Sequence, residues 1–204
     1  MSLRVGVLAS GRGSNLQAIL DAAAHPGYPA RVAVVVSDRE RAAALERATA
    51  AGVPAVFVNP KDYADRDAYD AALAGTLRDH QVGLVCLAGF MRILSPAFVR
   101  LFDGRILNIH PSLLPAFPGL HPHRQALEHG VRISGATVHF VEADVDTGPI
   151  VLQAAVPVEP GDTEATLAAR VLVEEHRLYP AAVRLFAEGR LRISGRRVIV
   201  GERP

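Results

Sequence analysis

The sequence predicts an α/β fold: a Rossmann-like, mostly parallel sheet wrapped by helices, followed by longer C-terminal strands and a long final helix. Over the first 110 residues, short runs rich in β-branched residues alternate with longer stretches of helical periodicity, which is typical of βαβ units. The short runs are apolar throughout instead of alternating with polar residues. Both faces of these strands are therefore expected to be covered, as in a parallel sheet.

Five strands and three helices are predicted in this first part. The helix at 15–24 has Ser14 placed to cap it, and the helix at 41–51 is ended by Gly52. A third helix is expected over about 62–79. The strands are expected at residues 3–9, 31–37, 53–58, 82–88 and 106–109.

The pattern changes after residue 110. Residues 110–122 contain four prolines and no periodicity, which predicts a long loop, and long loops inside a compact domain are often functional. Two longer strands, a helix that Pro180 is expected to kink, and a small hairpin complete the chain. They are expected at residues 131–141, 149–158, about 163–188, and 191–200.

The composition fits one globular domain, which we expect to span residues 1–204. Lys and Arg total 22 against 21 Asp and Glu, and a net charge of +1 gives no basic face for a nucleic-acid partner. The first apolar run ends at Ser10, too early for a membrane span or a secretory signal, so we expect a cytoplasmic protein without a membrane partner. Cys86 lies in an apolar run and is expected to be a buried hydrophobe. Monomer and homodimer both stay open.

A glycine-rich turn, Ser10-Gly11-Arg12-Gly13-Ser14-Asn15, joins the first predicted strand to the first predicted helix. Glycines let the backbone approach a ligand closely, and the start of a helix offers unpaired N–H groups to an anion. The turn lacks the third glycine of the dinucleotide motif and the lysine of the P-loop. A single phosphate monoester is the favoured ligand of this turn, and the alternative is a tight turn that binds no ligand.

Asn108 and His110 stand two residues apart at the end of the fifth predicted strand, so their side chains should point the same way. Open α/β sheets bind ligands at the carboxyl ends of such strands. A neutral amide donor and an imidazole are the groups needed to stabilise an oxyanion and handle a proton in acyl transfer. The alternative is a core histidine whose hydrogen bonds are satisfied.

A carboxylate beside His110 would hold the imidazole and raise its pKa above the ordinary value of about 6.5. Asp144 and Asp146 lie in a polar segment between two apolar strands and are the candidates. The spacing does not decide which of them reaches His110, and Asp-Thr-Gly-Pro is by itself more often a turn than a catalytic element.

Six blocks taken together resemble the folate-dependent glycinamide ribonucleotide formyltransferases, and the resemblance covers nearly the whole chain. The blocks containing Asn108, His110 and Asp146 are shared with a wider group of formyl-transferring enzymes, and the N-terminal Gly-x-Gly-Ser-Asn turn makes the match specific. The blocks are residues 10–18, 87–95, 107–115, 118–121, 135–141 and 146–150.

The resemblance implies transfer of a formyl group from 10-formyltetrahydrofolate, as co-substrate, to the amine of glycinamide ribonucleotide in de novo purine (IMP) synthesis, without a metal. Asn108 and protonated His110 would bind the formyl oxygen and stabilise the tetrahedral intermediate. Asp146 would pair with His110 and keep it charged, while a water carries the proton from the amine to the folate nitrogen.

The resemblance also implies the substrate contacts. The N-terminal half would bind the ribonucleotide and the C-terminal half the folate, with the active site between them. Gly13, Ser14 and Asn15 would hold the ribose 5-phosphate, and Glu175 would contact the sugar hydroxyls. The folate would be bound by Arg66, Met91, Arg92, Ile93, Leu94, Asn108, Glu142, Ala143, Asp144 and Val145.

Other interpretations remain open at this point. Arg66 and Glu175 lie on predicted helices, where a solvated charge is the usual explanation. His121, His123 and His139, alongside His110, suggest a metal site. The chain lacks a Glu-flanked His-x-x-x-His helix and a thiolate pair, so zinc is disfavoured, and His139 is expected either to be structural or to support a catalytic residue. The functional alternatives are a formyltetrahydrofolate hydrolase and a non-catalytic nucleotide-binding module.

Overall fold

The computed structural model describes residues 2–202 and divides into two compact units, the first ending at Leu107 and the second beginning at Asn108. Strand β5 (Ile106–His110) carries the chain from unit 1 into unit 2. Each unit contributes its own part of the mixed α/β fold that the sequence predicts. No helix within residues 2–202 has the length and apolar character needed to cross a membrane.

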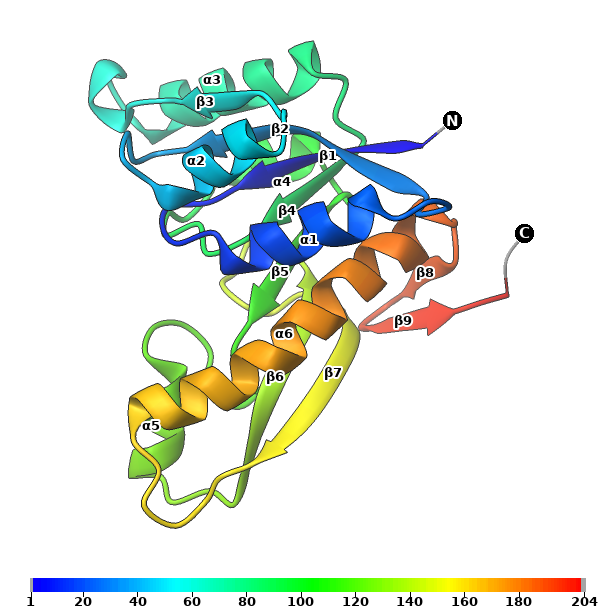
Figure 1. The fold of residues 1–204 in the computed structure, drawn as a ribbon. Helices are drawn as coiled ribbons and strands as arrows, with labels where there is room; N and C mark the ends of the chain where they lie inside the picture. The colour runs from blue at the N-terminus through cyan, green and yellow to red at the C-terminus, as the bar shows by residue number, and fades with distance from the viewer. Residues whose placement is uncertain (1, 203–204) are drawn as a thin grey trace. The chain divides into compact units, whose positions relative to one another are not determined.

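Unit 1 is built on parallel strands in the order β3-β2-β1-β4, with the start of β5 next (Figure 1). The central strands are buried on both faces, as predicted; Val34, Val35 and Val36 of β2 are fully buried. The short β3 at the edge is different, because Phe57 is 38% exposed, so full coverage is wrong for this strand. The four strands are β1 (Leu3–Leu8), β2 (Ala30–Ser37), β3 (Ala55–Phe57) and β4 (Leu84–Leu87).

Most helices of unit 1 begin where a side chain or a glycine caps them; α2 begins after Ala42, without a side-chain cap. The prediction that Ser14 caps α1 (Ser14–Ala24) is wrong, because Gly13 in the left-handed conformation is the cap and Ser14 is already helical. The long predicted helix starts late, as α3 (Arg66–Asp79), because Asp65 accepts the hydrogen bond of the Ala68 N–H. The remaining helices are α2 (Ala43–Ala50), the 3₁₀ turn η1 (Pro60–Asp62) and the unpredicted α4 (Pro96–Leu101).

Unit 2 continues from the end of β5 in the order β6-β7-β9-β8. Strands β6 (Ile133–Phe140) and β7 (Ile150–Pro157) are antiparallel, and the long helix α6 (Glu164–Ala187) packs against both (Figure 1). Strands β8 (Leu191–Ser194) and β9 (Arg197–Val200) form the predicted C-terminal hairpin.

Two further features of unit 2 concern its helices. A capping box between Thr163 and Thr166 starts α6, and Pro180 lies inside it. The short helix α5 (Pro122–Glu128), which the sequence did not predict, ends the proline-rich segment. It is tied to α6 by an ion pair between Arg124 and Glu164, with Nε and Oε1 2.6 Å apart.

The close approach of β6 and β7 at Gly135 gives a stability prediction. A β-carbon at this position would collide with the carbonyl oxygen of Ala154 on β7. We expect Gly135→Ala to lower the free energy of unfolding by about 2–3 kcal/mol, measured by urea denaturation, because overpacking against backbone is hard to relax.

The matched control is Gly75→Ala in the middle of α3, where nothing lies within 4 Å of the added carbon. Alanine is the better helix former, so this variant should gain about 0.5–1 kcal/mol. Equal stability of the two variants would contradict the predicted packing of β6 on β7.

Candidate active site

The glycine-rich turn between β1 and α1 needs glycine at position 13 for two reasons. Gly13 has φ of 69°, and a β-carbon there would lie 2.8 Å from Cα of Ala44. The first turn of α1 carries no acidic residue. The N–H groups at the start of this helix are therefore suited to an anion.

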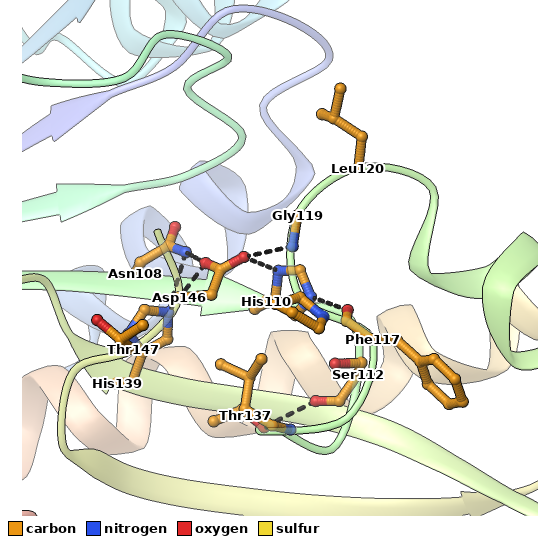
Figure 2. A network of polar contacts seen from close by, with 12 residues as sticks. Asn108, His110, Ser112, Phe117, Gly119, Leu120, Thr137, His139, Asp146 and Thr147 are labelled. Carbon is orange, nitrogen blue, oxygen red and sulfur yellow. Dashed lines mark hydrogen bonds and ion pairs between the residues drawn. The ribbon is translucent and has the colours of Figure 1, made fainter. Parts of the chain in front are cut away.

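Asn108 and His110 of β5 do point the same way, because both reach one carboxylate, that of Asp146 (Figure 2). Nδ2 of Asn108 is 3.4 Å from Oδ1 of Asp146, and Nδ1 of His110 is 3.3 Å from Oδ2. The structure thus decides between the two candidate aspartates. Asp146 makes the contacts, whereas Asp144 is exposed.

The Asp146 carboxylate is 8% exposed and is surrounded by nitrogen atoms. The backbone N–H of Gly119 donates to Oδ2 at 2.8 Å, and Nε2 of His139 lies 3.5 Å from Oδ1. Burial raises the pKa of Asp146, but its contacts with His139, the Gly119 N–H and His110 outweigh burial and lower the pKa below its usual value. Asp146 is therefore ionised at neutral pH.

The pKa of His110 runs against the sequence-based expectation. Its side chain is only 6% exposed, and burial lowers the pKa by more than Asp146 and the Phe117 carbonyl raise it. The prediction of a raised pKa is therefore wrong for this arrangement, because removing the imidazolium from water costs more than one carboxylate restores.

The contacts of His110 indicate which ring nitrogen takes up the second proton when the imidazole becomes charged. Nε2 faces the carbonyl oxygen of Phe117 at 2.9 Å and Nδ1 faces the Asp146 carboxylate at 3.3 Å. Both neighbours are acceptors, and we assign the proton of the neutral imidazole to Nε2 because that contact is the shorter. Nδ1 then presents its lone pair to Asp146. Protonation at Nδ1 would convert this contact into an ion pair.

His139 of β6 lies against Asn108 and Asp146, which agrees with the second of the two roles expected for it, the support of a catalytic residue. It is 2% exposed; its Nδ1 faces the Phe140 carbonyl at 2.8 Å, and its Nε2 lies 3.2 Å from Nδ2 of Asn108. With the proton on Nδ1, Nε2 accepts from Asn108; with the proton on Nε2, it donates to Oδ1 of Asp146 instead. The available signal was a histidine inside an otherwise apolar strand.

The segment after β5 is held in place by two side chains, the buried Thr137 of β6 and the exposed Gln153 of β7. Oγ1 of Thr137 donates to the Ser112 carbonyl at 2.7 Å and accepts from the Leu114 N–H at 3.1 Å (Figure 2). Gln153 donates to the Leu114 carbonyl at 2.9 Å. These bonds anchor the proline-rich segment that carries the Phe117 carbonyl and the Gly119 N–H.

The other predicted site residues are spread over the two units. In unit 1, Arg66 is exposed at the start of α3, and Arg92 lies over the Tyr69 ring. Met91 and Ile93 are 66% and 60% exposed, whereas Leu94 is buried. In unit 2, residues 142–145 form the exposed segment before Asp146, and Glu175 of α6 is buried. Direct contacts join Asn108, His110 and Asp146. Within residues 2–202, no group of three or more His, Cys, Asp or Glu side chains could hold a metal ion.

Comparison with known proteins identifies the family to which this chain belongs. The sequence model of a family described as formyl transferase matches residues 3–183. The chain belongs to the formyl transferase family. The histidine, the asparagine and the aspartate described above all lie within the matched region.

Members of the family with closely similar sequences are known. The phosphoribosylglycinamide formyltransferase of Escherichia coli is 49% identical over 191 residues, which cover 94% of this chain and 90% of that protein. The crystal structure of glycinamide ribonucleotide transformylase 1 from Symbiobacterium toebii has a TM-score of 0.97 and 60% identity, covering 98% of this chain and 95% of that one.

Two other relatives differ in length from this chain. The human trifunctional purine biosynthetic protein adenosine-3 is 50% identical over 93% of the chain, but the chain spans only about a fifth of its length (19%). A formyltetrahydrofolate deformylase from Pseudomonas syringae has a TM-score of 0.91 at 27% identity, covering 99% of this formyl transferase and 67% of that chain.

The buried site predicts the titration of His110. We expect its midpoint, followed by NMR of the imidazole carbons in the ligand-free protein, to lie below the ordinary value of 6.5. Asp146→Asn should lower the midpoint further, because burial remains and the carboxylate that opposes it is lost. A midpoint above 6.5 would show that the carboxylate dominates over burial, and a rise in the variant would show that Asp146 does not raise the pKa of His110.

Proposed function

We propose that this formyl transferase moves the formyl group of 10-formyltetrahydrofolate onto the amine of glycinamide ribonucleotide, in the cytoplasm, as a step of de novo purine synthesis. The observation that carries the proposal is the shared contact of Asn108 and His110 with a buried Asp146. Nearly full-length similarity to the E. coli phosphoribosylglycinamide formyltransferase supports the choice of substrates.

The residues would act on the charge that develops during the transfer. The amine nitrogen attacks the formyl carbon, a C–N bond forms, and the carbonyl oxygen becomes an oxyanion. An N–H of Asn108 and protonated His110 stabilise this oxyanion, and Asp146 balances the imidazolium. The intermediate collapses by breaking the bond from carbon to the folate N10, which takes up the proton that the amine releases through a water.

The geometry sets a condition on substrate binding. Nδ2 of Asn108 and both nitrogens of His110 already face acceptors within the protein. The formyl oxygen must therefore replace one of these acceptors. We propose that it takes over from Oδ1 of Asp146 as the acceptor of Asn108, because that 3.4 Å contact is the longest of the set, while protonated His110 stabilises the oxyanion through its charge.

The substrate contacts follow the family pattern. The ribose phosphate is assigned to Gly13, Ser14 and Asn15 at the start of α1, and the sugar hydroxyls to Glu175 on α6. The proposal therefore requires both units, and treats residues 1–204 as one functional domain. The folate is assigned to Arg66, Met91, Arg92, Ile93, Leu94, Asn108, Glu142, Ala143, Asp144 and Val145.

A formyltetrahydrofolate hydrolase is the second candidate, and the similarity in fold to the P. syringae deformylase is the observation that favours it. The deciding experiment measures tetrahydrofolate release from 10-formyltetrahydrofolate with and without glycinamide ribonucleotide. Release that needs the amine, with formyl appearing on it, supports the transferase. Release without the amine indicates the hydrolase, and a protein that binds both compounds without release is a binding module.

Removing either half of the buried pair should abolish most of the turnover. We expect His110→Ala and Asp146→Asn each to lower kcat by about two to four orders of magnitude, the usual range for general acid–base groups. Binding of glycinamide ribonucleotide, measured by calorimetry, should survive both changes. His25→Ala and Asp79→Asn, at exposed positions of unit 1, serve as controls. Near-normal turnover of His110→Ala would refute the assigned roles.

The phosphate assignment predicts a selective binding defect. Asn15→Ala should raise the KM for glycinamide ribonucleotide about tenfold, the effect of losing one hydrogen bond to a charged group. The KM for 10-formyltetrahydrofolate should change by less than about twofold, since no folate contact is assigned to this turn. Equal increases in both constants would place the phosphate elsewhere.

A further inference from the structure

We infer that Arg47 of α2 is a positioning residue for the glycine-rich turn, and that it fixes the backbone orientation with which this turn binds a phosphate monoester. The inference rests on the proposed function, which makes the ribose phosphate the guest of the turn. It assigns a role to a side chain that the proposed chemistry does not use.

Arg47 connects α2 to both the turn and the helix that follows it. Its Nε donates to the carbonyl oxygen of Arg12 at 2.9 Å, and its Nη1 donates to Oε1 of Gln17 at 3.0 Å. Gln17 in turn donates to Asp21 at 2.8 Å, one turn further along α1. One planar guanidinium thus holds the turn and the start of α1 in a fixed relation.

The backbone of α2 makes a second contact with the same turn. The N–H of Ala44 donates to the Gly11 carbonyl at 3.1 Å. Gly13 packs so closely here that a β-carbon would lie 2.8 Å from Cα of Ala44 and 3.3 Å from Cδ of Arg47. Two successive carbonyl groups, those of Gly11 and Arg12, are therefore directed at α2.

The orientation of these carbonyls determines where the N–H groups of the turn point. In a trans peptide the C=O of one residue and the N–H of the next point in opposite directions. The N–H groups of Arg12 and Gly13 consequently face away from α2. Together with the N–H groups at the start of α1, they form the kind of backbone nest that binds an anion.

The guanidinium itself faces oxygen acceptors of the protein through Nε and Nη1. Its contribution to phosphate binding therefore acts through the peptide of Arg12, which would be free to rotate if Arg47 were removed. This peptide joins Arg12 to Gly13, and because glycine at position 13 resists rotation least, the turn needs the side chain of a neighbouring helix to fix its orientation.

The test compares Arg47→Met, Arg47→Lys and the control Arg41→Ala, which removes an exposed cation two residues before α2. We expect Arg47→Met to raise the KM for glycinamide ribonucleotide about five- to twentyfold, the range for losing hydrogen bonds to a charged group. The kcat and the KM for 10-formyltetrahydrofolate should stay within about twofold of the parent values. Arg47→Lys should recover only part of the loss, because one ammonium group cannot reproduce the two-pronged contact.

Binding of ribose 5-phosphate, followed by ³¹P NMR, tests the inference apart from the reaction. It should weaken by a similar factor in Arg47→Met and remain unchanged in Arg41→Ala. Parent-like binding in Arg47→Met, or full recovery with lysine, would overturn the positioning role. If the parent protein binds ribose 5-phosphate but does not formylate glycinamide ribonucleotide, the proposed function fails while this comparison still decides the role of Arg47.

A folding defect is tested separately. Should thermal melting show that Arg47→Met is unfolded, Gln17→Ala removes one of the two anchors and leaves Arg47 in place. This variant should raise the same KM by a smaller factor, and an unchanged KM would overturn the inference.

Discussion

The burial of one negative charge, the carboxylate of Asp146, is the constraint on which the site depends. A carboxylate with 8% exposure persists only if hydrogen bonds and charges replace the water it has lost. The Gly119 N–H and the Asn108 amide donate hydrogen bonds to it, and ring nitrogens of His110 and His139 lie 3.3 and 3.5 Å from its oxygens. Because these groups come from β5, β6 and the segment between β5 and α5, the requirement fixes the conformation of several elements of unit 2 at once.

The same burial gives the pair its chemical character. It lowers the pKa of His110, while the contacts of Asp146 keep that carboxylate ionised, so the free site contains a neutral imidazole beside a carboxylate. A proton taken up at Nδ1 of His110 would form an ion pair of low exposure, in which attraction is strong because little water screens it. The proposed transfer needs the imidazolium only while negative charge develops on the formyl oxygen. A histidine that becomes protonated at that stage therefore suits the reaction better than one that is charged throughout.

Backbone strain occurs at two residues that contact His110. Asp146 and Phe117 both have φ of 55°, a conformation that costs free energy in residues other than glycine. Asp146 thereby turns its carboxylate toward β5, and Phe117 turns its carbonyl toward His110. In unit 1, Gly13 adopts a similar φ without that cost, and α2 directs the surrounding carbonyls. In each unit, a neighbouring helix, strand or loop therefore sets the direction of backbone groups whose orientation the local sequence does not determine.

The sequence by itself determined the parallel strands and their order of appearance, the glycine turn, the Asn-x-His pair and the C-terminal hairpin. These features follow from periodicity and from residues close together in the chain. Tertiary structure alone decided that Asp146 and not Asp144 meets His110, that His139 contacts Asn108, and that burial reverses the expected pKa shift of His110. It also decided how Thr137 and Gln153 anchor the proline-rich segment. Each of these depends on residues about 30 positions apart, and on how much water the fold removes, which local patterns do not encode.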